Sequence, residues 1–200
     1  MTHVVAITAG LSDPSSTRML ADYLVASVRR SLPDATVEVV ELRPLAHDIT
    51  DAMLSGFANP RLAGAIELVT SADALIVVSP IFKASYTGLL KSFVDALDSD
   101  VLTGKPVLLA ATGGTARHSL AIEFAMRPLF SYMQAYVVPT GVFASPHDWG
   151  TEGNAALTGR IDRAVGELVS VLAGGGTGRG AEDEFDLLSD TFLAASRPPE

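Results

Sequence analysis

The sequence has no cysteine among its 200 residues. Disulfides, thiol redox chemistry and thiolate metal sites are therefore excluded together. Any redox activity would depend on a cofactor that carries the electrons. His3, His47 and His147 show no metal-ligand spacing, and we expect no bound metal.

Long hydrophobic runs are missing as well. No stretch approaches the roughly 18 uninterrupted apolar residues that a membrane-spanning helix needs. The opening segment, MTHVVAITAG, lacks the basic start and the long apolar core of a signal peptide, and it is typical of a β-strand. We therefore expect a cytoplasmic protein.

Positive charge is scarce, with 14 Lys and Arg against 23 Asp and Glu and a formal net charge of -9. An acidic protein of this kind repels nucleic acid and anionic membranes, and we expect neither as a partner. A phosphate group would need a local site of backbone N–H groups, hydroxyls and a few placed cations. The sequence has no G-x-G-x-x-G, Walker or G-x-S-x-G motif to provide one of the common arrangements.

The chain does contain enough apolar residues, 48% of the total, for one buried core. Short β-branched runs predict five strands at residues 3–8, 36–42, 74–79, 106–112 and 136–143. Pro139 makes the last of these an edge strand or a bulged one. The run at 74–79 is continuously apolar, which is typical of a parallel strand buried on both faces.

Helical periodicity follows each strand. Leu20, Leu24 and Val28 recur four apart after the first strand, where Ser15 or Ser16 is the expected N-cap. Further helices are predicted at 60–70, 88–97, 118–134 and 154–172, whereas 43–59 has no clear pattern. The alternation predicts an α/β fold, a doubly wound five-stranded parallel sheet with helices on both faces.

We divide the chain into a domain at residues 1–173 and a tail at 174–200. The tail begins with a flexible Gly-rich linker. Residues 182–196 are acidic with an apolar stripe of Phe185, Leu187, Leu188, Phe192 and Leu193. Two interpretations stay open: a mostly disordered tail, or an amphipathic segment that docks on this subunit or on a neighbour.

The loops after the first, third and fourth strands are the places to look for a ligand, since open α/β sheets bind ligands beyond the carboxyl ends of their strands. In the first loop, Ser12, Ser15, Ser16 and Thr17 bring hydroxyls to a helix N-terminus, and Arg18 adds a cation. This combination favours a phosphate. A plain Ser-rich helix cap is the alternative.

The second loop, 80–88, places aromatic, cationic and hydroxyl groups after the buried strand. Phe82 or Tyr86 could pack against a flat aromatic ligand, with Ser85 among the nearby hydroxyls. Lys83 could stabilise negative charge on a reduced ring, or simply reach solvent. Without other signals, this is a loop with an exposed aromatic.

The third loop begins with Thr112, which two glycines follow. Gly113 and Gly114 would let a ligand approach the backbone closely. The alternative is a plain tight turn between strand and helix. Arg117 and His118 then start a helix, where a cation is unfavourable beside the helix dipole. They indicate a nearby anion such as a nicotinamide nucleotide phosphate, although His118 could equally be an exposed helix residue.

Four stretches, 14–18, 79–91, 111–118 and 123–128, together resemble the NAD(P)H-dependent FMN reductase family, in the right order and spacing. The resemblance covers about residues 3–173. It is strongest to the reductase component of two-component sulfonate monooxygenase systems. The sequence departs from that pattern at Phe82 and Phe124, where relatives carry tyrosine.

The resemblance implies a flavodoxin-like sheet in the order 2-1-3-4-5 that binds FMN. It assigns the FMN phosphate to Ser12, Ser15, Thr17 and Arg18. It assigns the isoalloxazine ring to Pro80, Ile81, Phe82 and Lys83, with Thr112, Gly113 and Gly114 at its other polar edge. It also implies a homodimer or homotetramer with the third and fourth helices at the interface.

The reaction that the resemblance implies is hydride transfer from NADPH or NADH to FMN, which needs no protein acid or base. Reduced FMN would then leave for a partner monooxygenase. One alternative is a quinone or azo reductase that keeps its FMN. The other is a non-enzymatic flavodoxin-type electron carrier, which the acidic charge also fits.

Overall fold

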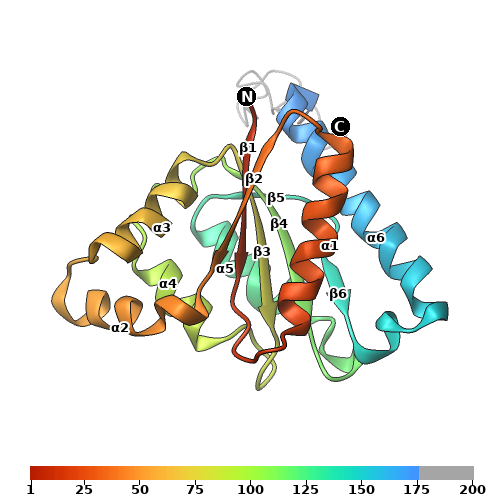
Figure 1. The fold of residues 1–200 in the computed structure, drawn as a ribbon, viewed down its shortest axis with the longest axis horizontal. Helices are drawn as coiled ribbons and strands as arrows, with labels where there is room; N and C mark the ends of the chain where they lie inside the picture. Colours follow the sequence, from red (N-terminus) through yellow and green to blue (C-terminus); the bar gives the residue numbers. More distant parts are fainter. Residues whose placement is uncertain (176–200) are drawn as a thin grey trace, which may run out of the picture.

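The computed structural model describes residues 1–175, so most of the predicted linker and all of the acidic tail lie outside the described residues. Its parallel sheet has the order β2-β1-β3-β4-β5, with β6 paired to β4 (Figure 1). The strands are β1 His3–Thr8, β2 Thr36–Glu41, β3 Ala74–Pro80, β4 Pro106–Thr112, β5 Tyr136–Val137 and β6 Val142–Ala144. The predicted fold class and flavodoxin-like strand order are confirmed.

Each central strand is buried on both faces. In β1, Val5 and Ile7 pack into one hydrophobic cluster, whereas Val4 and Ala6 pack into another on the opposite face. This alternation is the period-2 geometry of a strand, and it divides one sheet between two cores. β3 is buried from Ala74 to Ser79, as its continuous apolar run predicts.

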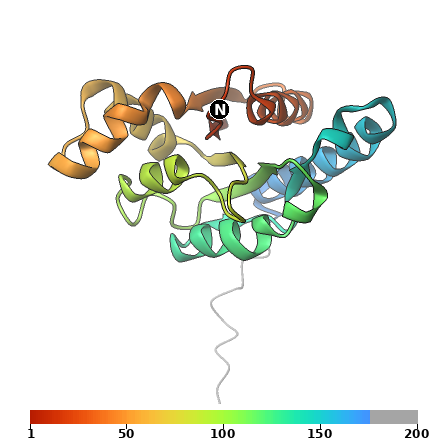
Figure 2. The same cartoon turned by 90° about the horizontal axis from the view of Figure 1, so that it is seen from below.

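Two helices cover the first face of the sheet, α1 (Ser16–Ser31) and α6 (Thr151–Ser170) (Figures 1 and 2). Ser15 is the N-cap of α1: its hydroxyl accepts a hydrogen bond from the Arg18 N–H at 3.2 Å. The position predicted for this cap is confirmed. The cap fixes where the first loop ends and the helix begins.

The opposite face carries α3 (Pro60–Ser71), α4 (Gly88–Asp95) and α5 (Arg127–Tyr132), which pack into the other core. The stretch without a clear pattern forms a short 3₁₀ turn, Arg43–Leu45, and then α2, Ala46–Ser55. α2 ends at Gly56, whose φ of 77° is a left-handed cap that suits glycine.

The fifth strand, predicted over 136–143 as an edge or bulged strand because of Pro139, is divided into two short strands. β5 pairs with the start of β4, and β6 pairs with its end. Pro139 lies between them and has no N–H for the ladder. The Arg127 guanidinium donates instead to the carbonyls of Val138 (3.1 Å) and Pro139 (2.9 Å).

The helix predicted over 118–134 is also interrupted. A 3₁₀ turn at Ala116–His118 precedes a π-helical turn at Ile122–Met126, and only then does α5 begin. Pro128 explains the change, because it cannot donate to a carbonyl one turn earlier and a regular α-helical ladder cannot pass through it. The last predicted helix begins three residues earlier than expected, at Thr151.

Within residues 1–175, no helix combines the length and the hydrophobicity needed to cross a bilayer.

The packing of α4 on the sheet makes a testable prediction. Phe93 is fully buried, and Phe93→Ala should lower the free energy of unfolding by roughly 3–5 kcal/mol through lost burial and a cavity. Urea denaturation measures this change. Phe57→Ala is the matched control: its ring is 82% exposed, and a change beyond about 0.5 kcal/mol there would contradict the core assignment.

Candidate functional site

The three predicted ligand loops meet at the carboxyl edge of the sheet. They line one pocket of about 310 Å³, with Ser12, Ser16 and Thr17 from the first loop, Pro80, Ile81 and Phe82 from the second, and Thr112, Gly113 and Gly114 from the third. We call this the ring pocket. Parallel strands bring their carboxyl ends to the same edge, which is why segments about 100 residues apart meet here.

The first and third loops are joined by a buried hydrogen bond. The hydroxyls of Thr17 and Thr112 lie 3.0 Å apart, and both residues are almost fully buried. Gly10 lets the first loop fold tightly, because a Cβ there would lie 2.4 Å from the Ser15 hydroxyl. The N-terminus of α1 is therefore held at a fixed place beside β4.

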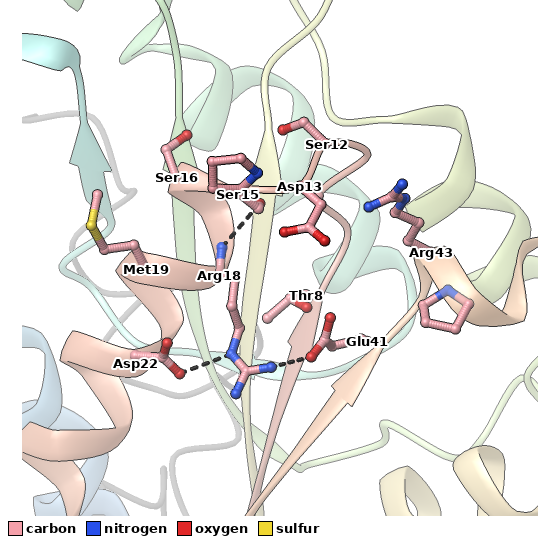
Figure 3. A pocket seen from close by; sticks show the side chains of 13 residues that line it. Thr8, Ser12, Asp13, Ser15, Ser16, Arg18, Met19, Asp22, Glu41 and Arg43 are labelled. Atoms are coloured by element: carbon pink, nitrogen blue, oxygen red, sulfur yellow. Dashed lines mark hydrogen bonds and ion pairs between the residues drawn. The ribbon is translucent and has the colours of Figure 1, made fainter.

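A larger hollow of about 980 Å³ opens on the β2 side of the first loop (Figure 3). We call it the outer cavity. Ser12 and Ser16 line both cavities, so the two cavities adjoin each other along this loop. Ser15 and Arg18 line only the outer cavity.

The Arg18 guanidinium is turned away from the serines and lies between two carboxylates (Figure 3). Its Nε is 2.8 Å from Asp22, and its Nη1 pairs with Glu41. The hydrogen bond to Asp22, supported by the charge of Glu41, raises the pKa of Arg18. The cation predicted to face a phosphate is thus already neutralised by its neighbours.

The second loop makes a tight turn. Phe82 and Ser85 exchange two backbone hydrogen bonds of 2.9 and 3.1 Å. Lys83 and Ala84 between them have positive φ values of 53° and 67°, a conformation that is costly for residues other than glycine and that is found at functional sites. The turn holds the half-exposed Phe82 ring at the mouth of the ring pocket.

The third loop requires its first glycine. A Cβ on Gly113 would lie 2.8 Å from Cζ of Phe143 and 3.1 Å from Cβ of His118. Gly114 has open space around it, which suits close approach of a ligand. The Nδ1 atom of His118 is buried and has no partner within the described part of the chain.

Four of the predicted site residues line neither cavity: Lys83, Ser85, Arg117 and His118. Each lies in one of the three loops, beside the residues that do line the ring pocket. The structure thus separates the predicted set into the walls of the cavities and a surrounding rim.

Sequence reasoning missed the fourth wall of the ring pocket, which β6 and the following 3₁₀ turn, Pro146–Trp149, supply through Ala144, Pro146 and Trp149. A signal was present. Ser145 and Asp148 form a capping box, the S-x-x-D pattern that marks a helix start. Arg160 of α6 pairs with Asp148 and so attaches this turn to the domain.

A sequence profile described as NADPH-dependent FMN reductase matches residues 2–150. The chain belongs to the NADPH-dependent FMN reductase family. The predicted oxidoreductase class, with FMN and NAD(P)H as its cofactors, is confirmed at the level of this family.

Relatives of the family agree along most of the chain. An FMN reductase (NADPH) of Pseudomonas aeruginosa is 40% identical over 86% of this chain and 92% of its own length. The NADH-dependent FMN reductase SfnE of Pseudomonas putida is 36% identical over 85% and 92%. A solved oxidoreductase structure from Corynebacterium diphtheriae superposes with a TM-score of 0.83 at 46% identity, covering 87% of this chain and 98% of that one.

The capping box of the fourth wall gives a pH prediction. Burial raises the pKa of Asp148, but hydrogen bonds from Ser145 and the charge of Arg160 outweigh it, and the net pKa is lowered. Because the pKa of Asp148 is lower in the folded than in the unfolded state, its carboxylate stabilises the fold at pH values above the unfolded pKa of about 4. This stabilisation is lost as the pH falls through the folded-state pKa. Asp148→Asn should be less stable at neutral pH and should lose less stability on acidification.

Thermal unfolding between neutral pH and about pH 3 measures this difference. Asp34→Asn removes an exposed carboxylate elsewhere and is the control. An Asp148→Asn profile that runs parallel to the wild-type profile at every pH would contradict the role of the carboxylate.

Proposed function

We propose that this chain binds FMN in the ring pocket and reduces it with NAD(P)H, releasing reduced flavin to a partner monooxygenase. The observation that carries the proposal is the shared wall: a helix N-terminus, an aromatic turn and a Gly-Gly turn surround one pocket. These three features suit a phosphate, a flat ring and the polar edge of that ring, respectively.

The phosphate end would lie at the start of α1. Its first-turn N–H groups and the hydroxyls of Ser12 and Ser16 are available to a phosphate there. The Ser15 hydroxyl accepts from the Arg18 N–H, which leaves its own proton free to donate. Thr17 anchors this end to β4 through Thr112.

The ring end would lie between the second and third loops. Ile81 and Phe82 supply apolar surface on one side, and the Thr112–Gly114 turn supplies backbone polar groups on the other. When bound, FMN supplies the hydride acceptor, and the protein's part is to orient the two cofactors and limit water. Pro80, Lys83 and Ser85 complete the second loop around the ring.

Arg117 and His118 would serve the nicotinamide nucleotide. Both follow the Gly-Gly turn, and Arg117 is exposed in the 3₁₀ turn three residues after Gly114. A nicotinamide stacked on the flavin would bring its phosphates toward this side, where a guanidinium can pair with them. The buried, unpartnered Nδ1 of His118 is a further hydrogen-bonding position in this loop.

The quaternary structure and the cellular location follow from the same proposal. Leu120, Phe124 and Tyr132 are between 61% and 85% exposed along the interrupted helix. Exposed apolar groups of this size favour burial between subunits, and we propose a homodimer or homotetramer that uses this helix and α4. The need for NAD(P)H favours the cytoplasm as the place of action.

The direct test is NAD(P)H oxidation by the purified full chain with and without added FMN. We expect oxidation that requires free FMN and saturates with it, because the flavin is a substrate that leaves. A yellow protein that oxidises NAD(P)H only in the presence of a quinone would make it a quinone reductase. No oxidation with any acceptor would leave a flavodoxin-type carrier and contradict the proposal.

Arg18 gives a second test, on flavin affinity. Arg18→Ala leaves Asp22 and Glu41 unpaired beside the proposed phosphate position, and their repulsion should raise the Kd for FMN by roughly five- to tenfold at low salt. Quenching of flavin fluorescence measures the Kd. Adding Glu41→Gln to the variant should restore part of the affinity. An unchanged Kd in Arg18→Ala would remove Arg18 from the phosphate site.

A further inference from the structure

The outer cavity is larger than the FMN phosphate requires. Its volume of about 980 Å³ lies at the top of the range of roughly 300–1,000 Å³ that is common for small-molecule sites. The ring pocket, by contrast, measures about 310 Å³. If the flavin phosphate lies at the serines that both cavities share, most of the outer cavity is left for another chemical group.

The charges of this cavity are mixed. Arg18 is neutralised by Asp22 and Glu41, as described above. The Arg43 side chain is exposed, and its guanidinium makes no hydrogen bond or ion pair with any residue between 1 and 175; only its backbone carbonyl is bonded, to the Ala46 N–H. It stands two residues after the end of β2, on the wall opposite Arg18 (Figure 3). The cavity therefore offers one available guanidinium, that of Arg43, together with the carboxylates of Asp13, Asp22 and Glu41, whose oxygens can accept hydrogen bonds.

Apolar surface completes the walls. Pro14, Met19 and Pro44 line the cavity, and the Met19 side chain is 40% exposed. Proline rings and a flexible thioether are suitable surfaces for a flat aromatic base. A ligand that fits must thus combine an anion for Arg43, hydroxyl or amino donors for the carboxylates, and a flat ring.

We propose that the outer cavity binds an adenosine phosphate group, with Arg43 as the residue that recognises its phosphate. A ribose supplies the hydroxyl donors for Glu41, and adenine supplies the ring. Inorganic phosphate has neither the ribose hydroxyls nor the adenine ring, so the cavity carboxylates would repel it without a compensating contact. The proposal rests on the proposed function, because that function places the flavin phosphate at the serines next to the cavity.

Both nicotinamide nucleotides of the proposed reaction, NADPH and NADH, carry this group, and so does FAD. In FAD, the adenylate continues directly from the flavin phosphate, and Ser12 and Ser16, which line both cavities, lie where the two groups would join. In NADPH, the adenosine carries an additional phosphate. The chemistry recognised is the same, and the experiment separates the two sources.

The experiment compares the wild-type full chain with Arg43→Ala and with Arg163→Ala. Arg163 is an exposed arginine on α6 that lines neither cavity, so its loss matches the change in net charge. ADP binding is measured by calorimetry without flavin, and the Kd values for FMN and FAD by fluorescence. KM is measured for NADPH and NADH.

We expect ADP to bind the wild type, and Arg43→Ala to weaken it about tenfold through loss of a charge-assisted contact, with FMN unchanged. A parallel loss for FAD assigns the cavity to the flavin dinucleotide, and a raised KM for NADPH assigns it to the nicotinamide nucleotide. Absence of ADP binding, or equal effects in Arg43→Ala and Arg163→Ala, would overturn the proposal.

The two proposals fail separately. A wild-type chain that binds ADP but not FMN would contradict the proposed function and retain the adenosine site. The opposite result is also possible. If the chain reduces FMN normally but Arg43→Ala leaves the Kd for ADP, the Kd for FAD and the KM for NADPH unchanged, the proposed function stands and the adenosine site is ruled out.

Discussion

The buried hydrogen bond between Thr17 and Thr112 holds the site together. One hydroxyl lies in the first turn of a helix and the other ends a strand 95 residues later, and both residues are almost fully buried. An unpaired buried hydroxyl costs about 1–3 kcal/mol, so the two loops keep one relative position. The proposed phosphate end and the proposed polar edge of the ring pocket are thereby set at a fixed separation, before any ligand arrives.

Much of this arrangement could be predicted because it depends on local signals. The continuous apolar run of β3 and the Ser15 cap express burial and capping rules that act within a few residues, and the structure confirms both. The irregularity at Pro139 was expected, but the division of the fifth strand into β5 and β6 was not, and the uninterrupted helix predicted over 118–134 was wrong. Pro139 and Pro128 act through missing N–H groups, and compensating contacts such as those of Arg127 could not be predicted from local pattern. The Lys83–Ala84 turn has no glycine to reveal its positive φ values.

The charge distribution shows how an acidic protein can serve anionic cofactors. A formal charge of -9 would repel a nucleotide at long range, yet the first loop offers N–H groups and hydroxyls whose dipoles act only at contact. Arg18 neutralises the negative charges of Asp22 and Glu41 beside the first loop. Selection of the ligand is therefore made at short distance, by shape and hydrogen bonds.

The break at Pro139 makes the width of the ring pocket depend on the length of the connection between β5 and β6. The residues between β5 and β6 touch neither cavity, but they decide where β6 rejoins β4 and hence where Trp149 stands. An insertion or deletion in this connection would move the fourth wall while every predicted cofactor residue kept its place. The length of this connection can thus alter the width of the ring pocket while the first, second and third loops stay unaltered.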